Sequence, residues 1–267
     1  REFSPAVEQY SIDEAWVDMT GTQRLWGPPR LAAELMRRRI WEELGFTVNI
    51  GISSNKLLAK MAGDFEKPNK VHTLFPEEME QKFYPLPVRE LFLVGRATEG
   101  KLQRMGIYTI GDLAKADVKM VKRRLGKQGE MLWHFANGRN AEAVTPEPAE
   151  NKGYSNATTT AHDVVTREEG CQVLLSLCET VAARLRKDGK CGSCVSIHLR
   201  TNEFRHFSHQ RVLSGATNVT TELFQAVCQL FDEAWDGITP LRQLGVQVTR
   251  LSGEPYQQFD FFSGMDP

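Results

Sequence analysis

Residues 143–153, AVTPEPAENKG, constrain the fold more than any other stretch, because they cannot continue a core helix or strand. The segment is rich in Pro and Glu and has no hydrophobic period, which is typical of a linker. Two prolines make a second break at residues 85–88, PLPV. The sequence therefore predicts three domains, a linker and a tail: residues 1–88, 89–142 and 154–250, the linker 143–153, and the tail 251–267.

The region after the linker alternates between strand and helix patterns. The segments 156–161, 195–201, 205–213 and 241–250 have the composition of strands, whereas 167–187 and 218–234 have a helical period. The resulting order, βαββαβ, is the split arrangement in which two helices cover one face of a single sheet.

The first domain mixes the two element types, whereas the second is helical. We expect a strand, a tight turn and a strand within residues 8–20, then a helix that begins at Pro28-Pro29 and ends at Gly45. A strand at 46–52 and a helix at 55–64, capped by Ser53 or Ser54, follow. Residues 89–138 are short helical segments separated by glycines. The fold class is therefore multidomain α+β.

Composition places the chain among globular proteins and excludes a membrane span. It is 41% hydrophobic and 25% charged, and no apolar run approaches the length of about 18 residues that a spanning helix needs. The net charge is −1, yet residues 89–153 carry 12 Lys and Arg against 8 Asp and Glu. A local basic excess of this kind attracts anionic partners more than the total charge suggests.

The five cysteines are too few and too scattered for a disulfide framework, which favours a reducing compartment. Cys191 and Cys194 have the CxxC spacing of some metal and redox sites. No second pair stands nearby to complete a zinc site, so a turn before a strand is the simpler interpretation.

Two adjacent acids, Asp13 and Glu14, stand within the strand-like decapeptide YSIDEAWVDM at residues 10–19. Neighbouring side chains on a regular strand point to opposite faces, so the two carboxylates converge only at a turn or bend. Two converging carboxylates, completed by substrate phosphates and water, suit Mg²⁺. The alternative is that both acids are simply exposed on the hairpin turn.

The segment GISSNKLLAKMAGDFEKPNK, residues 51–70, brings Lys56, Lys60 and Lys67 near the acid pair if strand 46–52 lies beside the hairpin. A lysine there can contact a phosphate as a point charge. The alternative is a solvated helix face.

Together these motifs resemble the palm domain of the Y-family of translesion DNA polymerases, and of its bacterial DinB/UmuC-like members in particular. The resemblance rests on YSIDEAWVDMTG and VNIGISSNKLLAKMAGDFEKPN, in this order and separation. The segment LFLVGRATEGKLQRMGIYTIGDL, residues 91–113, is similar to the helix-hairpin-helix of the family's thumb. The βαββαβ module matches the position and topology of its little-finger domain.

The resemblance implies a role for individual residues. Asp13 and Glu14 match metal-binding carboxylates, Glu14 being the active-site acid, and two Mg²⁺ ions serve the complete enzyme. Lys67 matches a lysine that contacts the incoming deoxynucleoside triphosphate, and Ser11 and Asp64 flank that site. Gly95 matches a glycine whose backbone N–H approaches a DNA phosphate.

Two departures from the family pattern stand out. Leu93 occupies the place of the first glycine of the Gly-x-Gly hairpin. The family's other catalytic Asp, on an upstream strand, and its fingers domain are not among these 267 residues. We therefore expect this chain to be a fragment that does not polymerise alone.

Further basic residues indicate contacts with primer-template DNA. In the thumb-like segment they stand beside the hairpin, and in the last domain they lie on strands with an Arg- and His-bearing face. Arg205, Phe207, His209 and Arg211 are expected on one face of their strand. The expected DNA-binding residues are Gly95, Arg96, Lys101, Arg200, Arg205 and Arg211.

The tail carries QQFDFF at residues 257–262, which resembles the peptide by which bacterial polymerases dock on the sliding clamp. Its expected anchors are Gln258, Phe259, Phe261 and Phe262. The alternative is a tail packed against its own domain. A cytoplasmic bacterial monomer is expected.

A different class of function remains open: a non-catalytic adaptor that binds DNA and the clamp, with a vestigial acid pair. A nucleotidyl cyclase-like palm also places paired acids on a hairpin. The helix-hairpin-helix and the clamp-like tail argue against this third interpretation.

Overall fold

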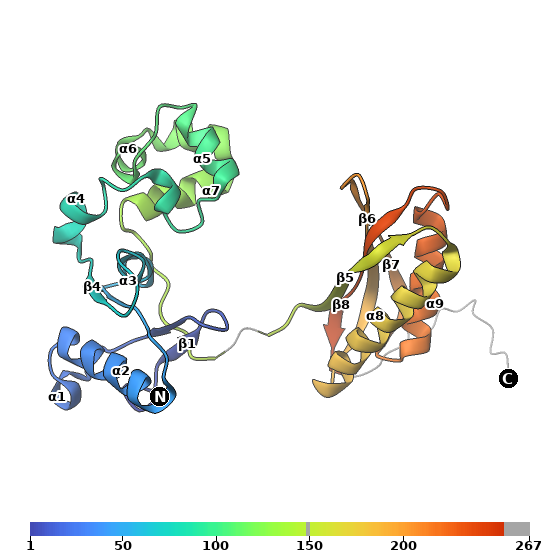
Figure 1. The fold of residues 1–267 in the computed structure, drawn as a ribbon, viewed down its shortest axis with the longest axis horizontal. Coiled ribbons are helices and arrows are strands. Elements are labelled where there is room, and N and C mark those ends of the chain that lie inside the picture. The colour runs from blue at the N-terminus through green and yellow to red at the C-terminus, as the bar shows by residue number, and fades with distance from the viewer. Residues whose placement is uncertain (148–149, 254–267) are drawn as a thin grey trace. The chain divides into compact units, whose positions relative to one another are not determined.

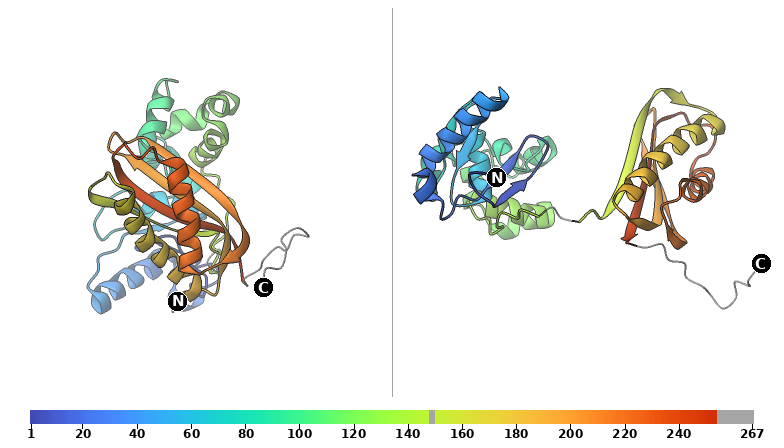
Figure 2. Two further views of the ribbon diagram at one scale, coloured as in Figure 1. Left: turned by 90° about the vertical axis from the view of Figure 1, so that its right-hand side faces the viewer. Right: turned by 90° about the horizontal axis from the view of Figure 1, so that it is seen from below.

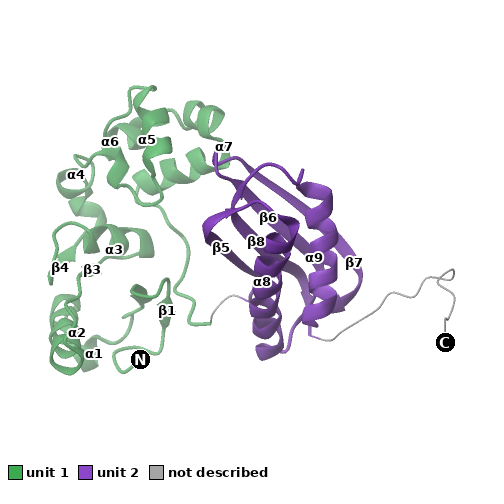
Figure 3. Ribbon diagram, turned by 45° about the vertical axis from the view of Figure 1, so that its right-hand side comes forward, with its two compact units in different colours: residues 1–148 green, residues 149–267 purple. Residues whose placement is uncertain are grey.

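The computed structural model describes residues 1–147 and 150–253. The chain divides into two compact units, Arg1–Pro148 and Ala149–Pro267 (Figure 3). In the described ranges no helix is long and apolar enough to cross a membrane.

Unit 1 begins with two small sheets and the helices packed on them (Figure 1). The antiparallel hairpin of β1 (Val7–Gln9) and β2 (Ala15–Val17) is one sheet, and β3 (Ile50–Ile52) pairs in parallel with β4 (Val71–Thr73) in the other. The helices between these strands are α1 (Gln23–Trp26), α2 (Pro29–Leu44) and α3 (Lys56–Gly63).

Helix boundaries in unit 1 follow from local chemistry. Helix α2 starts at Pro29 and is closed by Gly45 at φ 70°, as the sequence indicates. The predicted cap of the next helix was wrong: Asn55 caps α3 by accepting a hydrogen bond from the Leu58 N–H. Ser53 instead donates its hydroxyl to the carbonyl of Leu74, which fastens the end of β3 to the chain beyond β4.

Short helical segments and the 19-residue α7 complete unit 1. They are η1 (Pro76–Glu78), α4 (Met79–Lys82), η2 (Val88–Glu90), α5 (Arg96–Gln103), α6 (Ile110–Lys115) and α7 (Val118–Ala136). Thr109 and Asp112 form a reciprocal capping box at the start of α6. One hydrophobic cluster runs from Leu57 and Leu58 in α3 to Leu132 and Ala136 in α7, so residues on both sides of position 88 share a core.

Unit 2 is a four-stranded antiparallel sheet with two helices on one face (Figure 1, Figure 2). Its elements are β5 (Gly153–Val164), α8 (Arg167–Lys187), β6 (Cys191–Thr201), β7 (His206–Thr217), α9 (Thr220–Ala234) and β8 (Leu241–Ser252), and the strand order is β5-β8-β6-β7. The βαββαβ prediction is confirmed. Val195, Ile197 and Leu199 of β6 are buried in the core against α8 and α9.

Candidate active site

The two acids lie in the turn of the β1–β2 hairpin rather than within a strand. The backbone N–H groups of Tyr10 and Ser11 both donate to the carbonyl of Glu14, which closes the turn. The Ser11 hydroxyl donates to Asp13 Oδ1 at 2.7 Å. Asp13 and Glu14 line one cavity of about 1050 Å³. A turn thus frees both carboxylates from the alternation of a strand.

A chain of ion pairs runs from the hairpin to the turn that contains Lys67. Lys60 Nζ donates to Glu14 at 2.6 Å and to Asp64 at 3.0 Å. The second oxygen of Asp64 lies 2.8 Å from Lys67 Nζ. Charges therefore alternate along Glu14, Lys60, Asp64 and Lys67, and all four line the same cavity.

The protonation behaviour of this network follows from its contacts. Burial alone raises the pKa of Asp64, but hydrogen bonds from Lys67 and Lys60 outweigh burial and hold the pKa below its ordinary value. Burial alone lowers the pKa of Lys60, but hydrogen bonds to Glu14 and Asp64 outweigh it and raise the pKa. Both groups are therefore charged at neutral pH.

Gly51 in β3 and Asn49, the residue before this strand, place these side chains. Gly51 packs so tightly on α3 that a Cβ there would lie 1.9 Å from the carbonyl oxygen of Ala59, and this close approach brings Lys60 toward the hairpin. The Asn49 amide donates to the carbonyls of Gly63 and Glu66 and fixes the turn that carries Lys67. Asn49 was not predicted from the sequence, although a polar residue inside the strand-like segment FTVNIGI is a signal for such a role.

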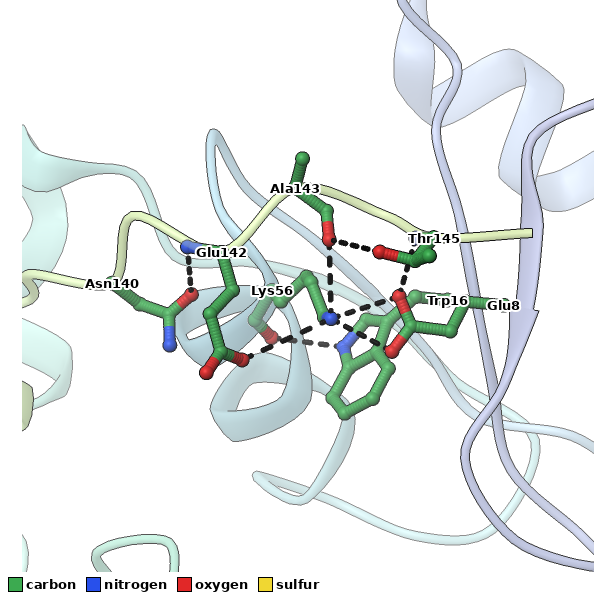
Figure 4. Close-up of polar contacts among 7 residues, drawn as sticks. All are labelled: Glu8, Trp16, Lys56, Asn140, Glu142, Ala143 and Thr145. Carbon is green, nitrogen blue, oxygen red and sulfur yellow. Dashed lines mark hydrogen bonds and ion pairs between the residues drawn. The ribbon is translucent and has the colours of Figure 1, made fainter. Parts of the chain in front are cut away.

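The Lys56 side chain is largely buried and contacts Glu8, Trp16 and Ala143 (Figure 4). Its side chain is only 9% exposed, and Nζ lies 2.8 Å from both carboxylate oxygens of Glu8. It also donates to the carbonyl of Ala143 and lies over the Trp16 ring, whose Nε1 donates to the Lys56 carbonyl. Glu8 accepts the Thr145 N–H as well. The alternative interpretation, a lysine on a solvated helix face, is thus wrong for Lys56. Its partner Glu8 was not identified from the sequence.

The donor set of the cavity is compatible with a hard cation but is not a closed metal centre. In the described part of the chain, no cluster of three or more His, Cys, Asp or Glu residues could hold a metal ion. Asp13 is exposed, and its carboxylate accepts the hydrogen bond from the Ser11 hydroxyl. Two carboxylates with free oxygen lone pairs leave most positions of a Mg²⁺ shell for phosphate or water oxygens.

The expected DNA-binding residues of the thumb-like segment lie directly before α5 and within it. Gly95 is the residue before the helix, and Arg96 and Lys101 lie in it. Leu93 adopts φ 69° and is 47% exposed. This left-handed conformation is the one that glycine favours, so the backbone shape of a glycine is kept here with a leucine in its place.

The predicted basic residues of unit 2 do not share one surface. Arg211 pairs with Val195 across the β6–β7 ladder and donates to Gln229 and Glu233 of α9, so it points to the helix-covered face. Arg200 is five residues after Val195 and therefore points to the opposite face, where its guanidinium lies 4.6 Å from the Phe204 ring. The face of β7 that Arg211 shares with Phe207 and His209, which was expected to meet DNA, is the face that packs against α9.

Other predicted residues stand as follows. Arg205 precedes β7 and pairs with Glu203 at 3.3 Å. The clamp-like peptide, with Gln258, Phe259, Phe261 and Phe262, lies outside the described residues.

Comparison with family models matches most of the chain. Residues 1–64 match the impB/mucB/samB family, residues 151–261 match the C-terminal domain of that family, and residues 90–140 match the thumb domain of DNA polymerase-iota.

Relatives and a solved structure agree with these matches. The chain is 40% identical to DNA polymerase IV of Clostridium acetobutylicum over 98% of this chain and 66% of that protein. It is 36% identical to DNA polymerase IV of Moorella thermoacetica over 100% of this chain and 67% of that protein. A Y-family DNA polymerase chimera shares the fold, with a TM-score of 0.77 at 21% identity over 93% of this chain and 72% of the chimera.

The chain thus spans about two thirds of the length of these relatives. The order of the matched domains, the identity to the relatives and the shared fold agree with one another. This chain belongs to the Y-family of DNA polymerases.

Proposed function

We propose that the protein containing this chain is a translesion DNA-directed DNA polymerase, which adds deoxynucleotides to a primer opposite damaged template. The observation that carries the proposal is the unbroken line of charges from Glu14 through Lys60 and Asp64 to Lys67 along one cavity. It joins the acid pair to a cationic turn, as a site for a metal-bound triphosphate requires. The family membership of the chain supports the same activity.

Asp13 and Glu14 are the proposed oxygen ligands for Mg²⁺. When bound, two such ions polarise the phosphate and stabilise the attacking and leaving oxygens of an in-line displacement. Ser11 orients the Asp13 carboxylate, and Lys60 orients that of Glu14 while offsetting part of the negative charge. Both residues hold the acids in place before substrate arrives, which is how a protein contributes to this chemistry.

Lys67 is the proposed contact for the triphosphate. Its side chain is 61% exposed, and its ion pair with Asp64 keeps it at the cavity. An exposed ammonium group on a flexible stem can leave one carboxylate oxygen and neutralise a phosphate at small cost. Asp64 retains its bond to Lys60 when Lys67 moves, so the hairpin need not shift.

The cavity also supports completion of the site by a strand from outside these 267 residues. In the described ranges β2 pairs with β1 and β3 pairs with β4, so the two sheets are separate. Both β2 and β3 line the cavity, together with apolar residues of α2 such as Ala32 and Met36. Strand edges beside an apolar cleft can accept a further strand, and we propose that this strand carries the remaining catalytic Asp.

DNA contacts are proposed for Gly95 and Arg96 at the start of α5, for Lys101 in its last turn, and for Arg200 and Arg205 in unit 2. The N-terminal end of α5 presents backbone N–H groups that suit a phosphate oxygen. Arg200 lies on the face of the sheet that the helices leave uncovered. Arg211 is held by α9, so we assign it to the packing of unit 2.

Primer extension tests the proposal. The chain extended by the upstream third of its relatives is expected to add deoxynucleotides in Mg²⁺, whereas residues 1–267 alone bind DNA without extending it. In the extended protein, Asp13→Ala or Glu14→Ala should abolish extension while the dissociation constant for DNA stays near normal. Retained extension in either variant refutes the assignment.

The second candidate is a non-catalytic adaptor that binds DNA and the sliding clamp. The same experiment separates the two, because an extended protein that binds DNA but adds no nucleotide supports the adaptor. For the clamp, the double change Phe261→Ala with Phe262→Ala should remove stimulation by the bacterial clamp and leave basal extension unchanged. Stimulation that persists in this variant shows that the tail does not bind the clamp.

A further inference from the structure

Cys171 and Cys228 form a thiol pair that nothing in their sequence context indicates. Cys171 lies early in α8 and Cys228 lies in α9, 57 residues further along the chain. Their Sγ atoms are 3.7 Å apart, and all five cysteines are free thiols. Two sulfurs in van der Waals contact need a side-chain shift of less than 2 Å to reach the bonded distance of about 2.05 Å.

The CxxC motif, by contrast, does not bring its thiols together. Cys191 and Cys194 both lie on β6, where they pair in regular register with Ser252 and Thr249 of β8. Because the residues are three apart on a strand, their side chains point to opposite faces of the sheet. Both are buried. The thiol pair of unit 2 is therefore the one across the helices.

The packing of α8 on α9 holds the two thiols in contact. One helical turn away on each helix, Arg167 and Asp232 form a two-pronged ion pair with N–O distances of 2.6 and 2.8 Å. Gly170 lies so close to α9 that a Cβ there would be 2.5 Å from the Phe231 ring. An ion pair and a close helix approach thus fix this seam at the level of the cysteines.

Reagents can reach this pair but not the other thiols. Cys171 and Cys228 are partly exposed, whereas Cys178, Cys191 and Cys194 are buried. Burial raises the pKa of the Cys228 thiol to about 12, and the nearby Arg167 guanidinium opposes that rise. The thiolate is the nucleophile, and the contact between the two sulfurs lets either cysteine make the first attack while the other closes the bond.

We propose that Cys171 and Cys228 are a reversible oxidation site, at which a low-molecular-weight disulfide converts the two thiols into a disulfide linking α8 to α9. The thiolate of one cysteine attacks the small disulfide, forms a mixed disulfide and releases one small thiolate. The thiol of the other cysteine then gives its proton to that released thiolate, attacks the protein sulfur of the mixed disulfide and releases the second small thiolate, which takes a proton from water. Two cysteines are oxidised by two electrons, and one small disulfide is reduced to two thiols.

Peptide mapping of the 267-residue chain tests the proposal without any variant. The protein is incubated with glutathione disulfide at pH 8, unfolded in denaturant, alkylated without reduction, digested and analysed by mass spectrometry. The expected result is a fall from five alkylatable thiols to three and a linked peptide pair that contains Cys171 and Cys228. The thermal midpoint of unit 2 should rise by several degrees and return on reduction.

Matched variants and a control reaction decide the remaining outcomes. Cys171→Ser and Cys228→Ser should each remove the linked peptide pair, whereas Cys194→Ala should retain it. The proposal is overturned if the linked peptides contain Cys178, Cys191 or Cys194 instead. It is equally overturned if only mixed disulfides form, or if five thiols remain while a two-cysteine peptide in the same tube is oxidised.

Discussion

The ion pair between Glu8 and Lys56 gives the sharpest stability prediction. Glu8→Gln removes the carboxylate charge that lies 2.8 Å from a lysine whose side chain is 9% exposed. Lys56 keeps the Ala143 carbonyl at 3.3 Å and the Trp16 ring at 4.7 Å as partners. Removing one member of a fully buried pair costs about 3–5 kcal/mol. Because Glu8 is 20% exposed and weaker partners remain, we expect a loss of about 2 kcal/mol.

The pH dependence of this contribution has a definite sign. Burial alone raises the pKa of Glu8, but the hydrogen bonds from Lys56 and the Thr145 N–H outweigh burial and lower the pKa. A carboxyl whose folded pKa is depressed stabilises the fold above its unfolded pKa, and the stabilisation is lost as pH falls through the folded value. The difference between wild type and Glu8→Gln should therefore be full at neutral pH and shrink in acid.

Urea unfolding followed by tryptophan fluorescence measures the effect, since Trp16 contacts Lys56 directly. The matched control is Glu142→Gln, because Glu142 lies 4.0 Å from Lys56 but is 77% exposed, and its loss should cost less than about 0.5 kcal/mol. The double variant Glu8→Gln with Lys56→Met should be less destabilised than the sum of the singles. A Glu8→Gln variant as stable as Glu142→Gln would refute the reasoning.

Three further changes test other parts of the structure. Gly51→Ala forces a Cβ against the Ala59 carbonyl and should lower the free energy of unfolding in urea by about 3 kcal/mol. The control Gly63→Ala, whose nearest contact is 3.6 Å away, should lower it far less. Equal losses of stability would contradict the close packing of β3 on α3. Arg211→Ala should lower the stability of unit 2 by about 1 kcal/mol or less and leave DNA affinity nearly unchanged. Arg200→Ala, in contrast, should weaken DNA binding in a fluorescence anisotropy titration. The reverse pattern would contradict the opposite sheet faces assigned to these two residues. Lys60→Met should lower the thermal stability between about pH 5 and pH 9, because the depressed pKa of Asp64 and the raised pKa of Lys60 keep both groups charged there. A variant with an unchanged pH profile of thermal unfolding would contradict the ion-pair network of Glu14, Lys60, Asp64 and Lys67.

The element order of unit 2 could be predicted from sequence because its signals are local. The alternation of strand residues and the helical period of 167–187 depend on neighbours in the chain, and Thr166 caps α8 as a threonine at that place should. The face of the sheet toward which the Arg211 side chain points could not be predicted from such local signals. Which side of a strand faces the helices depends on the register with β6, and register is a property of the pairing.

In the site of unit 1, too, the residues marked by a local pattern could be predicted, and the contacts between distant residues could not. Asp13 and Glu14 stood out because adjacent acids disrupt a strand pattern, and they lie in the turn between β1 and β2. The contacts of Glu8 with Lys56 and of Asn49 with the Lys67 turn join residues far apart in the chain, so no local pattern reveals them. The pairing of Cys171 with Cys228 likewise depends on helix packing. The CxxC segment, which was expected to be a turn before a strand, lies within β6 instead, and the strand separates its two thiols.

Iron-directed cleavage measures most directly whether the acid pair holds a divalent ion. Fe²⁺ replaces Mg²⁺ in the extended protein bound to primer-template and nucleotide, and ascorbate with peroxide then cuts the backbone next to the ion. The account predicts cuts in the hairpin at residues 10–14, lost in Asp13→Ala and reduced by excess Mg²⁺. Cuts confined to other segments, or a hairpin pattern unchanged in Asp13→Ala, would contradict it.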